Sequence, residues 1–596
     1  MLFKYIWFFV VLLFCWSCAQ QGSPSGGPRD EDPPVPLETD PPNYSTRFES
    51  KKIYITFDEY IVLDNVNQQL IVSPPMEEKP EVTLRKKTLI IEFEEALRIN
   101  TTYTFNFGDA IKDLHEGNKL QNYEYVFSTG DVLDSLSLKG TLKYAENLEA
   151  PEEPFSIMLY SDLRDSVPLI DIPFYVGRSN DSGVFSVNNL RPDVYKVFAL
   201  KDANNNFLFD LPTEEIAFLD SSLIVNADFA RRLLGDTVVP VVVPDTIIAD
   251  STGMAADSIV DKGPDLNAIY IDLMLFTEEP EIQYLTDYSR EDRRKLLLTF
   301  ARPLTDTFFY HFLQEENEKG LTVLDHFSSN RDSLTLWVKD SLQYKRDSLF
   351  MEVGYTIKDT SDQYVIRKDT LLFSYKEQSS RNKRGQAKEK EEEKLAIHTI
   401  RNNANQELNL KLPLVIDFPL DRIQDTLISL YHIPDSLELA VPFVVKIDST
   451  TLGRASLSAS WESAANYRLV ALPGAISSIY SLEHDTIDVK FSTRDLEYYG
   501  QILLSLENVK DRVMIQLFSG NKMLGERTIV EDGQYVFPFL APKEYSFKFI
   551  HDLNGNGKWD TGKYMEKLQP EPVELLPVKI EVRSNWDHDV TMKLEK

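Results

Sequence analysis

Cysteine is almost absent from this sequence. Its 596 residues contain only Cys15 and Cys18, and both lie in the first eighteen positions. The rest of the chain has neither disulfides nor a thiol for catalysis or metal binding, so its stability depends on packing. With 42% hydrophobic and 11% aromatic residues it can bury proper cores. At this length we expect several domains of about 100–150 residues each.

Basic residues are also scarce. The chain has 63 Lys and Arg against 94 Asp and Glu, which gives a formal net charge of −31. Such an acidic surface repels nucleic acid and anionic lipid headgroups. The sequence therefore predicts no nucleic-acid partner.

Recognisable catalytic motifs are missing from the sequence. The eight histidines include no pair at metal-ligand spacing, and no H-E-x-x-H is present. There is no G-x-S-x-G elbow, no P-loop and no dinucleotide-binding glycine motif. Pairs of acidic residues do not indicate a catalytic site, because most of the 94 Asp and Glu side chains are expected to be solvated at the surface. We therefore predict a protein that is not an enzyme.

Helical periodicity is scarce, and apolar and polar residues alternate instead. In KKIYITFDEY the apolar set is Ile53, Ile55 and Phe57, and TLIIEFEEAL and TYTFNF repeat the pattern. Short period-two runs between turn residues predict antiparallel, half-buried strands. We therefore predict an all-β fold of tandem antiparallel β-sandwiches, five in number.

The first eighteen residues, MLFKYIWFFVVLLFCWSC, place one Lys before a short apolar run, which predicts a secretion signal over residues 1–18. Cys18 follows Ser17 and precedes Ala19. This resembles the lipobox of bacterial lipoproteins, although Cys15 and Trp16 depart from its consensus. The resemblance implies a lipid on Cys18 and an outer-membrane anchor, with ordinary signal cleavage as the alternative. Which face of the membrane the protein occupies stays open.

Residues 38–130 carry a recognisable set of motifs. They include the opening Pro41-Pro42, the strand Ile55–Glu59, Thr102-Tyr103, a turn with Asp113 and Gly117-Asn118, and the closing residues 127–129. This pattern resembles the SbsA-type bacterial Ig-like domain, which implies a β-sandwich. The Gly- and Pro-rich tether before it also resembles the start of envelope lipoproteins from Bacteroidota-type bacteria.

The sequence repeats itself at two offsets. At an offset of 364, Tyr103 falls on Tyr467 and residues 127–129 fall on 491–493. At an offset of 350, eight residues fall on identical ones: Gly183, Leu190, Pro192, Tyr195, Asp202, Asn204, Asn206 and Asp210. Eight identities in thirty ungapped positions indicate a duplicated pair of β domains.

The second member of each pair has the pattern G-x-F/Y, L-x-P-x-x-Y, a strand and D-x-N-x-N. This is similar to prealbumin-like, carboxypeptidase-regulatory-like or Cna-B-like β-sandwiches. Between the pairs, LLLTFARPL and DSLTLWV indicate a further, divergent Ig-like domain.

These observations predict the following organisation, by residue number: a lipoprotein signal at 1–18, a Gly/Pro tether at 19–37, an Ig-like domain at 38–130, a prealbumin-like sandwich at 131–232, a linker at 233–266, a divergent Ig-like domain at 267–376, a charged linker at 377–396, an Ig-like domain at 397–495 and a prealbumin-like sandwich at 496–596.

Two loops have the spacing of oxygen ligands. Asp202, Asn204, Asn206 and Asp210 in one copy match Asp552, Asn554, Asn556 and Asp560 in the other. These are positions 1, 3, 5 and 9 of a calcium loop, but position 12 is Thr213 or Lys563 instead of Glu. Glu214, one residue late, is a partial substitute in the first copy. Calcium is the one cofactor that the sequence suggests, and a tight Asx-type turn is the alternative.

The prediction that follows is a non-catalytic envelope lipoprotein, a multi-domain scaffold, interaction or spacer protein on the outer membrane. Its partner is an unidentified envelope protein or glycan. The alternative is a glycan-binding lipoprotein of a polysaccharide-uptake system. That role would need exposed aromatic rings, for which Trp337, Trp461, Trp559 and Tyr498-Tyr499 are the candidates, although such residues more often pack in cores.

Overall fold

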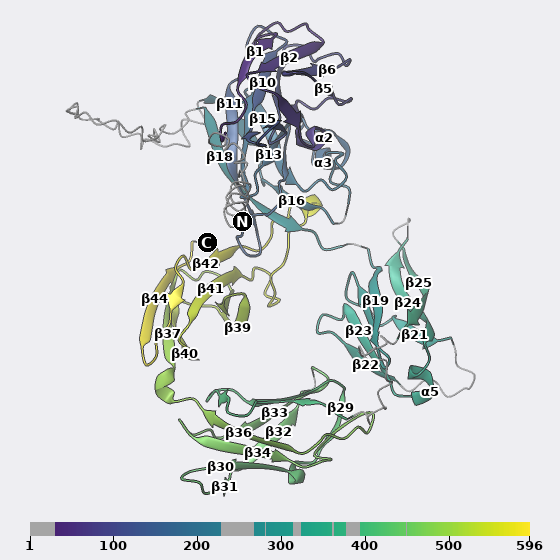
Figure 1. The fold of residues 1–596 in the computed structure, drawn as a ribbon, viewed down its shortest axis with the longest axis vertical. Helices are drawn as coiled ribbons and strands as arrows, with labels where there is room; N and C mark the ends of the chain where they lie inside the picture. The colour runs from purple at the N-terminus through teal and green to yellow at the C-terminus, as the bar shows by residue number, and fades with distance from the viewer. Residues whose placement is uncertain are drawn as a thin grey trace, which may run out of the picture. The chain divides into compact units, whose positions relative to one another are not determined.

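The computed structural model describes residues 30–211, 213–227, 267–280, 282–313, 323–359, 363–376, 394–448 and 450–595. These residues are 50% strand and 4% helix, which confirms the predicted all-β fold of tandem β-sandwiches (Figure 1). They form two compact units. The first runs to Tyr144 and from Glu149 to Phe276, and the second comprises Ala145–Leu148 and the chain from Thr277 onward. No helix among the described residues is long and apolar enough to cross a membrane.

The first sandwich belongs to the first unit. Its elements are β1 (Pro36–Asp40), β2 (Lys52–Phe57), β3 (Ile61–Leu63), α2 (Val66–Gln69), β4 (Ile71–Ser73), β5 (Glu81–Arg85), β6 (Thr88–Glu92), β7 (Thr102–Asn106), β8 (Ile111–Asp113), β9 (Lys119–Leu120) and β10 (Glu124–Ser128). One sheet has the order β1-β2-β6-β5, the facing sheet β10-β7-β4, and a small third sheet β3-β8-β9.

Alternation along these strands decides which side chains are buried. Ile53, Ile55 and Phe57 of β2 are at most 1% exposed, as the period-two pattern predicted. The alternate apolar residues of the other two runs are also buried, at most 4% exposed, and complete one hydrophobic core with the ring of Phe127. They are Leu89, Ile91, Phe93, Tyr103, Phe105 and Phe107. Full burial of each such side chain stabilises the fold by about 1.5–3 kcal/mol.

The second sandwich completes the first unit. Its elements are β11 (Leu136–Tyr144), β12 (Ser156–Tyr160), α3 (Val167–Ile170), β13 (Tyr175–Ser179), β14 (Val184–Leu190), β15 (Asp193–Leu200), β16 (Glu215–Phe218), β17 (Leu223–Val225) and β18 (Ala268–Thr277). Their order is β12-β13-β14-β11-β18-β16-β15-β17, and β12 also pairs with β15.

Strand β18 shifts one of the expected boundaries. The sequence placed residues 267–276 at the start of the third domain. In the structure β18 pairs in parallel with β11, from Ser137 opposite Ala268 to Tyr144 opposite Leu275. Ile269, Leu273 and Leu275 then enter the core of the second sandwich. This strand therefore closes the second domain, because a parallel partner is joined through a long connection that local pattern does not reveal.

The second unit contains three further sandwiches. The third is built from β19 (Leu285–Asp292), β20 (Lys295–Phe300), β21 (Phe309–Phe312), β22 (Val323–Phe327), β23 (Ser333–Val338), α5 (Ser341–Tyr344), β24 (Ser348–Lys358) and β25 (Tyr364–Ser374). Its sheets have the orders β19-β20-β23-β22 and β21-β24-β25.

The fourth sandwich has sheets of order β26-β28-β33-β32 and β27-β36-β34-β30-β31, with β29 paired to β35. Its elements are β26 (Ile397–His398), β27 (Asn405–Gln406), β28 (Leu412–Ile416), β29 (Leu420–Ile423), η1 (Asp425–Leu427), β30 (Ile428–His432), β31 (Leu439–Ala440), β32 (Phe443–Ile447), β33 (Arg454–Ala459), β34 (Asn466–Ala471), β35 (Ile476–Ser478) and β36 (Ile487–Thr493).

The fifth sandwich has sheets of order β40-β37-β44 and β39-β38-β41-β42, with β43 paired to β41. Its elements are η2 (Leu496–Tyr498), β37 (Gly500–Glu507), β38 (Val513–Ser519), β39 (Lys522–Ile529), β40 (Gly533–Leu540), β41 (Glu544–His551), η3 (Tyr564–Glu566), β42 (Val573–Leu575), β43 (Ile580–Glu581) and β44 (Asp587–Lys593).

Strand pairing repeats between sandwiches. The order β1-β2-β6-β5 of the first recurs as β19-β20-β23-β22 in the third and β26-β28-β33-β32 in the fourth. The parallel pair β11–β18 of the second recurs as β37–β44 in the fifth, and β12–β15 recurs as β38–β41. The copies differ at two places. β13 pairs with β14 and β18 with β16 in the second sandwich, whereas the matching β39 and β40, and β44 and β42, lie in separate sheets of the fifth.

Matched tyrosines make the same contacts in both copies. The Tyr103 hydroxyl accepts the backbone N–H of Arg98 at 2.9 Å, and the Tyr467 hydroxyl accepts that of Glu462 at 2.9 Å. In the other pair, the hydroxyls of Tyr195 and Tyr545 each donate at 2.9 Å to the carbonyl four residues earlier. Each hydrogen bond links a tyrosine of a core strand to the backbone four or five residues earlier, as the tyrosine corner does in immunoglobulin sandwiches.

The Asp113 turn explains one of the sequence motifs. Its carboxylate accepts the backbone N–H groups of His115, Gly117 and Asn118 at 2.8, 3.0 and 2.6 Å, and that of Glu116 as well. Gly117 has a φ of 81°, a conformation that favours glycine. Burial opposes ionisation of the Asp113 carboxyl, but the four donors outweigh it and lower its pKa to about 2.

We predict that Asp113→Asn destabilises the first unit at neutral pH and removes part of its acid sensitivity. A carboxyl with a depressed pKa contributes stability that is complete above the unfolded value of about 3.9 and is lost as pH falls through about 2. The difference in urea midpoint between wild type and variant should therefore shrink from pH 5 to pH 2. Asp306→Asn is the control, because its side chain is fully exposed. A difference that stays constant with pH would contradict the role given to Asp113.

Candidate functional site

The two Asp/Asn loops follow equivalent strands, β15 in the second sandwich and β41 in the fifth. In the first loop, Asp202 accepts the N–H groups of Asn206 and Phe207 at 3.1 and 2.8 Å. The amides of Asn204 and Asn206 both donate to Asp210, at 3.3 and 2.9 Å. The residues predicted from spacing do lie together, and hydrogen bonds within the loop hold them.

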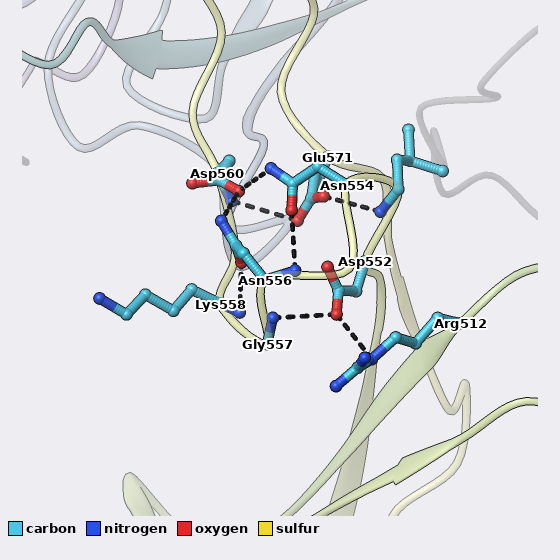
Figure 2. Close-up of polar contacts among 9 residues, drawn as sticks. Arg512, Asp552, Asn554, Asn556, Gly557, Lys558, Asp560 and Glu571 are labelled. Carbon is cyan, nitrogen blue, oxygen red and sulfur yellow. Dashed lines mark hydrogen bonds and ion pairs between the residues drawn. The ribbon is translucent and has the colours of Figure 1, made fainter.

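The second loop has the same arrangement (Figure 2). Asp552 accepts the N–H of Gly557 at 3.0 Å, and Asn556 accepts that of Lys558 at 2.8 Å. The amides of Asn554 and Asn556 donate to one oxygen of Asp560, at 2.5 and 2.6 Å.

A buried glutamate that follows each loop also contacts it. Glu214 is 1% exposed and accepts the N–H groups of Ala203, Asp210 and Leu211 at 3.3, 3.1 and 3.1 Å. Glu571 is 5% exposed and accepts those of Leu553 and Asp560 at 2.8 and 3.2 Å. The sequence offered Glu214 as a partial substitute and missed Glu571, which lies nineteen positions after Asp552 and has no fixed spacing to signal it.

Burial raises the pKa of Glu571, and the N–H donors of Leu553 and Asp560 oppose that rise. A carboxyl whose pKa is raised by folding makes its contribution to stability at low pH. That contribution is lost as pH rises from the unfolded value through the raised one.

Asp552 distinguishes the second loop from the first. It is 2% exposed, and its Oδ2 is held by Gly557 and by Arg512 Nε, both at 3.0 Å (Figure 2). Its Oδ1 has no hydrogen-bond partner although it is buried. Both oxygens of Asp202 are engaged. A bare buried carboxylate oxygen is costly, and a cation would satisfy it.

The carboxylates of the loops do not by themselves form a metal centre. Among the described residues, no group of three or more His, Cys, Asp or Glu is placed to hold a metal ion. The oxygens that a calcium ion would use are Asp552, Asn554, Asn556, Asp560 and Glu571, and most of them now accept backbone N–H groups.

The aromatic candidates do not form a platform. Trp337 is 8% exposed and packs edge-on against Phe418. Trp461 packs on Tyr467 and donates its indole N–H to Leu410 at 3.1 Å. Trp559 donates to the Glu571 carbonyl at 2.9 Å. For these three tryptophans the packing role is the one the structure shows.

The other pair, Tyr498 and Tyr499, also makes internal contacts. Tyr498 lies under the Arg494 guanidinium, 4.3 Å from its ring centroid, and the Tyr499 hydroxyl donates to Glu407 at 2.6 Å. Cys18, the predicted lipid site, lies outside the described residues.

Comparison with known proteins identifies one segment. Residues 30–129 match the bacterial Ig-like domain. The third and fourth sandwiches share the strand order of this segment, so the same fold recurs in them. No curated protein matches the chain.

Solved structures similar to the chain include alpha-2-macroglobulin from Escherichia coli, at 11% identity, 45% of this chain, 93% of that chain and a TM-score of 0.18. The S-layer protein SbsC is 10% identical over 92% of this chain and 67% of that one, with a TM-score of 0.14. The pilin subunit BcpA of Bacillus cereus is 10% identical over 78% and 99%, with a TM-score of 0.12. TM-scores this low carry no argument about function.

We predict that Glu571→Gln loosens the second loop. An amide offers one acceptor oxygen where the carboxylate has two, so a buried N–H of Leu553 or Asp560 loses its partner, at a cost of about 1–3 kcal/mol. Hydrogen exchange should show faster exchange in residues 552–571. Glu566→Gln, whose side chain is 61% exposed, is the control. Equal exchange in both variants would show that Glu571 does not hold the loop.

Proposed function

We propose that this protein is a non-catalytic scaffold of the cell envelope, anchored by a lipid on Cys18 and presenting its domains to another envelope component. The observation that supports it is modular repetition. The described residues form five sandwiches, each with its own main hydrophobic core, and their strand pairings fall into two recurring types. Closed sandwiches in tandem resist deformation and offer loops for contact. The Ig-like match of residues 30–129 is consistent with this role but is not specific to it.

The sequence makes a direct test of partner contact feasible. Because the chain beyond Cys18 has no cysteine, single cysteines can be introduced at exposed positions, one in each sandwich. Suitable positions are Ile99, Leu163, Tyr364, Leu437 and Val530, which are 46–85% exposed.

We expect thiol-specific cross-linking in cells to give a reproducible adduct with an envelope component from at least one of these sites. The adduct should disappear with Cys18→Ser, which removes the predicted lipid site, and persist with Cys15→Ser, its neighbour in the leader. Fatty-acid labelling of the same variants shows whether Cys18 carries the lipid. Lack of adducts from all five sites would contradict the scaffold role. Labelling that survives Cys18→Ser would contradict the anchor.

We also propose that calcium binds the second loop, and the first loop more weakly. Binding is supported by the Asn and Asp oxygens at positions 3, 5 and 9 and by the buried Glu571, which stands in for the missing position-12 acid. The higher affinity of the second loop is supported by Asp552 Oδ1, which has no hydrogen-bond partner. A bound ion would rigidify the loop. To reach it, Asn554 and Asn556 would give up hydrogen bonds within the loop, which limits affinity.

Duplication supplies the matched control for calcium. At millimolar Ca²⁺ we expect slower hydrogen exchange in residues 552–571 of the full chain. The effect should vanish with Asp552→Asn, which keeps shape but removes charge, and remain with Asp202→Asn. If millimolar Ca²⁺ changes neither exchange nor thermal midpoint in wild type, both loops are plain Asx-type turns.

A further inference from the structure

A cleft of about 1030 Å³ lies within the first unit, between its two sandwiches. One side is formed by α2, β4, β7, β9 and the start of β10 in the first sandwich, with the turn that follows β7. The other side is formed by β11, β13 and β14 of the second sandwich, with Tyr270 of β18. Its volume is at the upper end of the range for ligand-binding pockets, so it suits an oligomeric ligand better than a single small molecule.

Direct hydrogen bonds fix the two sides to each other. The N–H of Val176 donates to Ser73 Oγ at 3.0 Å, and both residues are buried. The Asn189 amide donates to Thr104 Oγ1 at 2.9 Å. Arg178 donates to the Gln68 carbonyl at 2.9 Å. The cleft is therefore a preformed feature of the unit, which lowers the cost of binding.

The charges of the cleft cancel. Three basic residues (Lys119, Lys139, Arg178) and three acidic residues (Asp109, Glu124, Asp181) line it, which gives a net charge of zero in a chain of −31. Several are already engaged. Lys119 pairs with Asp109 at 2.8 Å, and Glu124 accepts the amides of Asn106 and Asn188 at 3.0 and 3.1 Å. A charged ligand would gain little here.

Neutral amides are the largest polar group in the remaining lining. They are Asn65, Gln68, Gln69, Asn106, Asn122, Asn180 and Asn188. Four of them already make hydrogen bonds within the protein: Gln69, Asn106, Asn180 and Asn188. Among the described residues, the side chains of Asn65, Gln68 and Asn122 make none, so these three amides are available to a ligand. Each amide side chain has donors and an acceptor on one planar group, as the hydroxyl pairs of a sugar ring require. Tyr270, 51% exposed, adds a ring face on which a sugar can stack. Sequence inspection missed this residue, because its exposure follows from the position of β18.

A peptide fits the same lining less well. In the second sandwich, β11 is hydrogen-bonded to β14 and β18, and β14 to β11 and β13, so neither has a free edge to which an extended peptide could add. In the first sandwich, β4 and β9 end their sheets but are only three and two residues long, which is too short to pair with an extended peptide. Among the apolar lining residues, Val176, Phe185 and Val187 are at most 3% exposed. Val184, which is 51% exposed, and the half-buried Ile71 are the accessible branched aliphatic ones, and two such side chains are too few for the series of pockets that an extended peptide uses.

We infer that this cleft binds an uncharged oligosaccharide, with Tyr270 as the stacking ring and the surrounding amides as hydrogen-bonding groups. The inference does not rest on the scaffold proposal, since a glycan could be either the anchored protein's partner or an independent ligand.

The test uses the full chain without its leader on an array of neutral oligosaccharides that includes cello-, malto-, xylo- and mannohexaose. Hexagalacturonate is the charged comparator and a Gly-Ser hexapeptide is the peptide comparator. Affinity for the best neutral binder is then measured by calorimetry. We expect Tyr270→Thr and Gln68→Ala each to weaken it at least tenfold. Tyr364→Thr, an exposed strand tyrosine of the third sandwich, should leave it unchanged.

Both cleft substitutions are at exposed or half-exposed positions, so unchanged unfolding midpoints will separate lost binding from lost folding. Three results would overturn the inference. They are lack of binding to any neutral glycan at millimolar concentration, equal affinity in wild type and both cleft variants, and preference for hexagalacturonate or the peptide.

Discussion

Burial of alternate side chains between two facing sheets is the interaction on which the rest of this structure depends. Without disulfides, each sandwich must offset the conformational entropy of its strands with apolar burial and hydrogen bonds alone. It does so locally, because each of the five cores draws its buried residues from one sandwich. Loops can then vary between copies without disturbing the cores that position them.

Duplication shows which contacts the fold needs and which it can change. The tyrosine hydroxyls of Tyr103 and Tyr467 make the same backbone bond in both Ig-like copies, and those of Tyr195 and Tyr545 do so in the other pair. By contrast, β13 pairs with β14 in one copy, whereas the matching β39 and β40 do not pair in the other. One carboxylate oxygen of Asp552 has no hydrogen-bond partner, whereas both oxygens of the matching Asp202 accept hydrogen bonds.

The sequence predicted the features that are local. Period-two runs predicted the strands β2 (Lys52–Phe57) and β7 (Thr102–Asn106), and ungapped self-alignment predicted a duplicated pair of β domains, whose strand pairings recur in the structure. Features that depend on distant pairing escaped it. β18 joins β11 after more than a hundred residues, Glu571 reaches its loop from nineteen positions away, and the cleft exists only because two sandwiches meet. The sequence left the tryptophans as candidates for surface rings or for core packing, because residue type alone does not reveal whether a side chain faces the core.

The scaffold, calcium and glycan proposals share one assumption, which is that each sandwich is held by its own core. Each proposal assigns function to loops or clefts that these independent cores position. Hydrogen exchange on Leu298→Ala and Leu504→Ala tests that independence most directly. Both side chains are fully buried, in the third and fifth cores, so each truncation costs about 2–5 kcal/mol. The account predicts faster exchange only in residues 285–374 for the first variant and only in 500–593 for the second. Faster exchange across both ranges in either variant would contradict it.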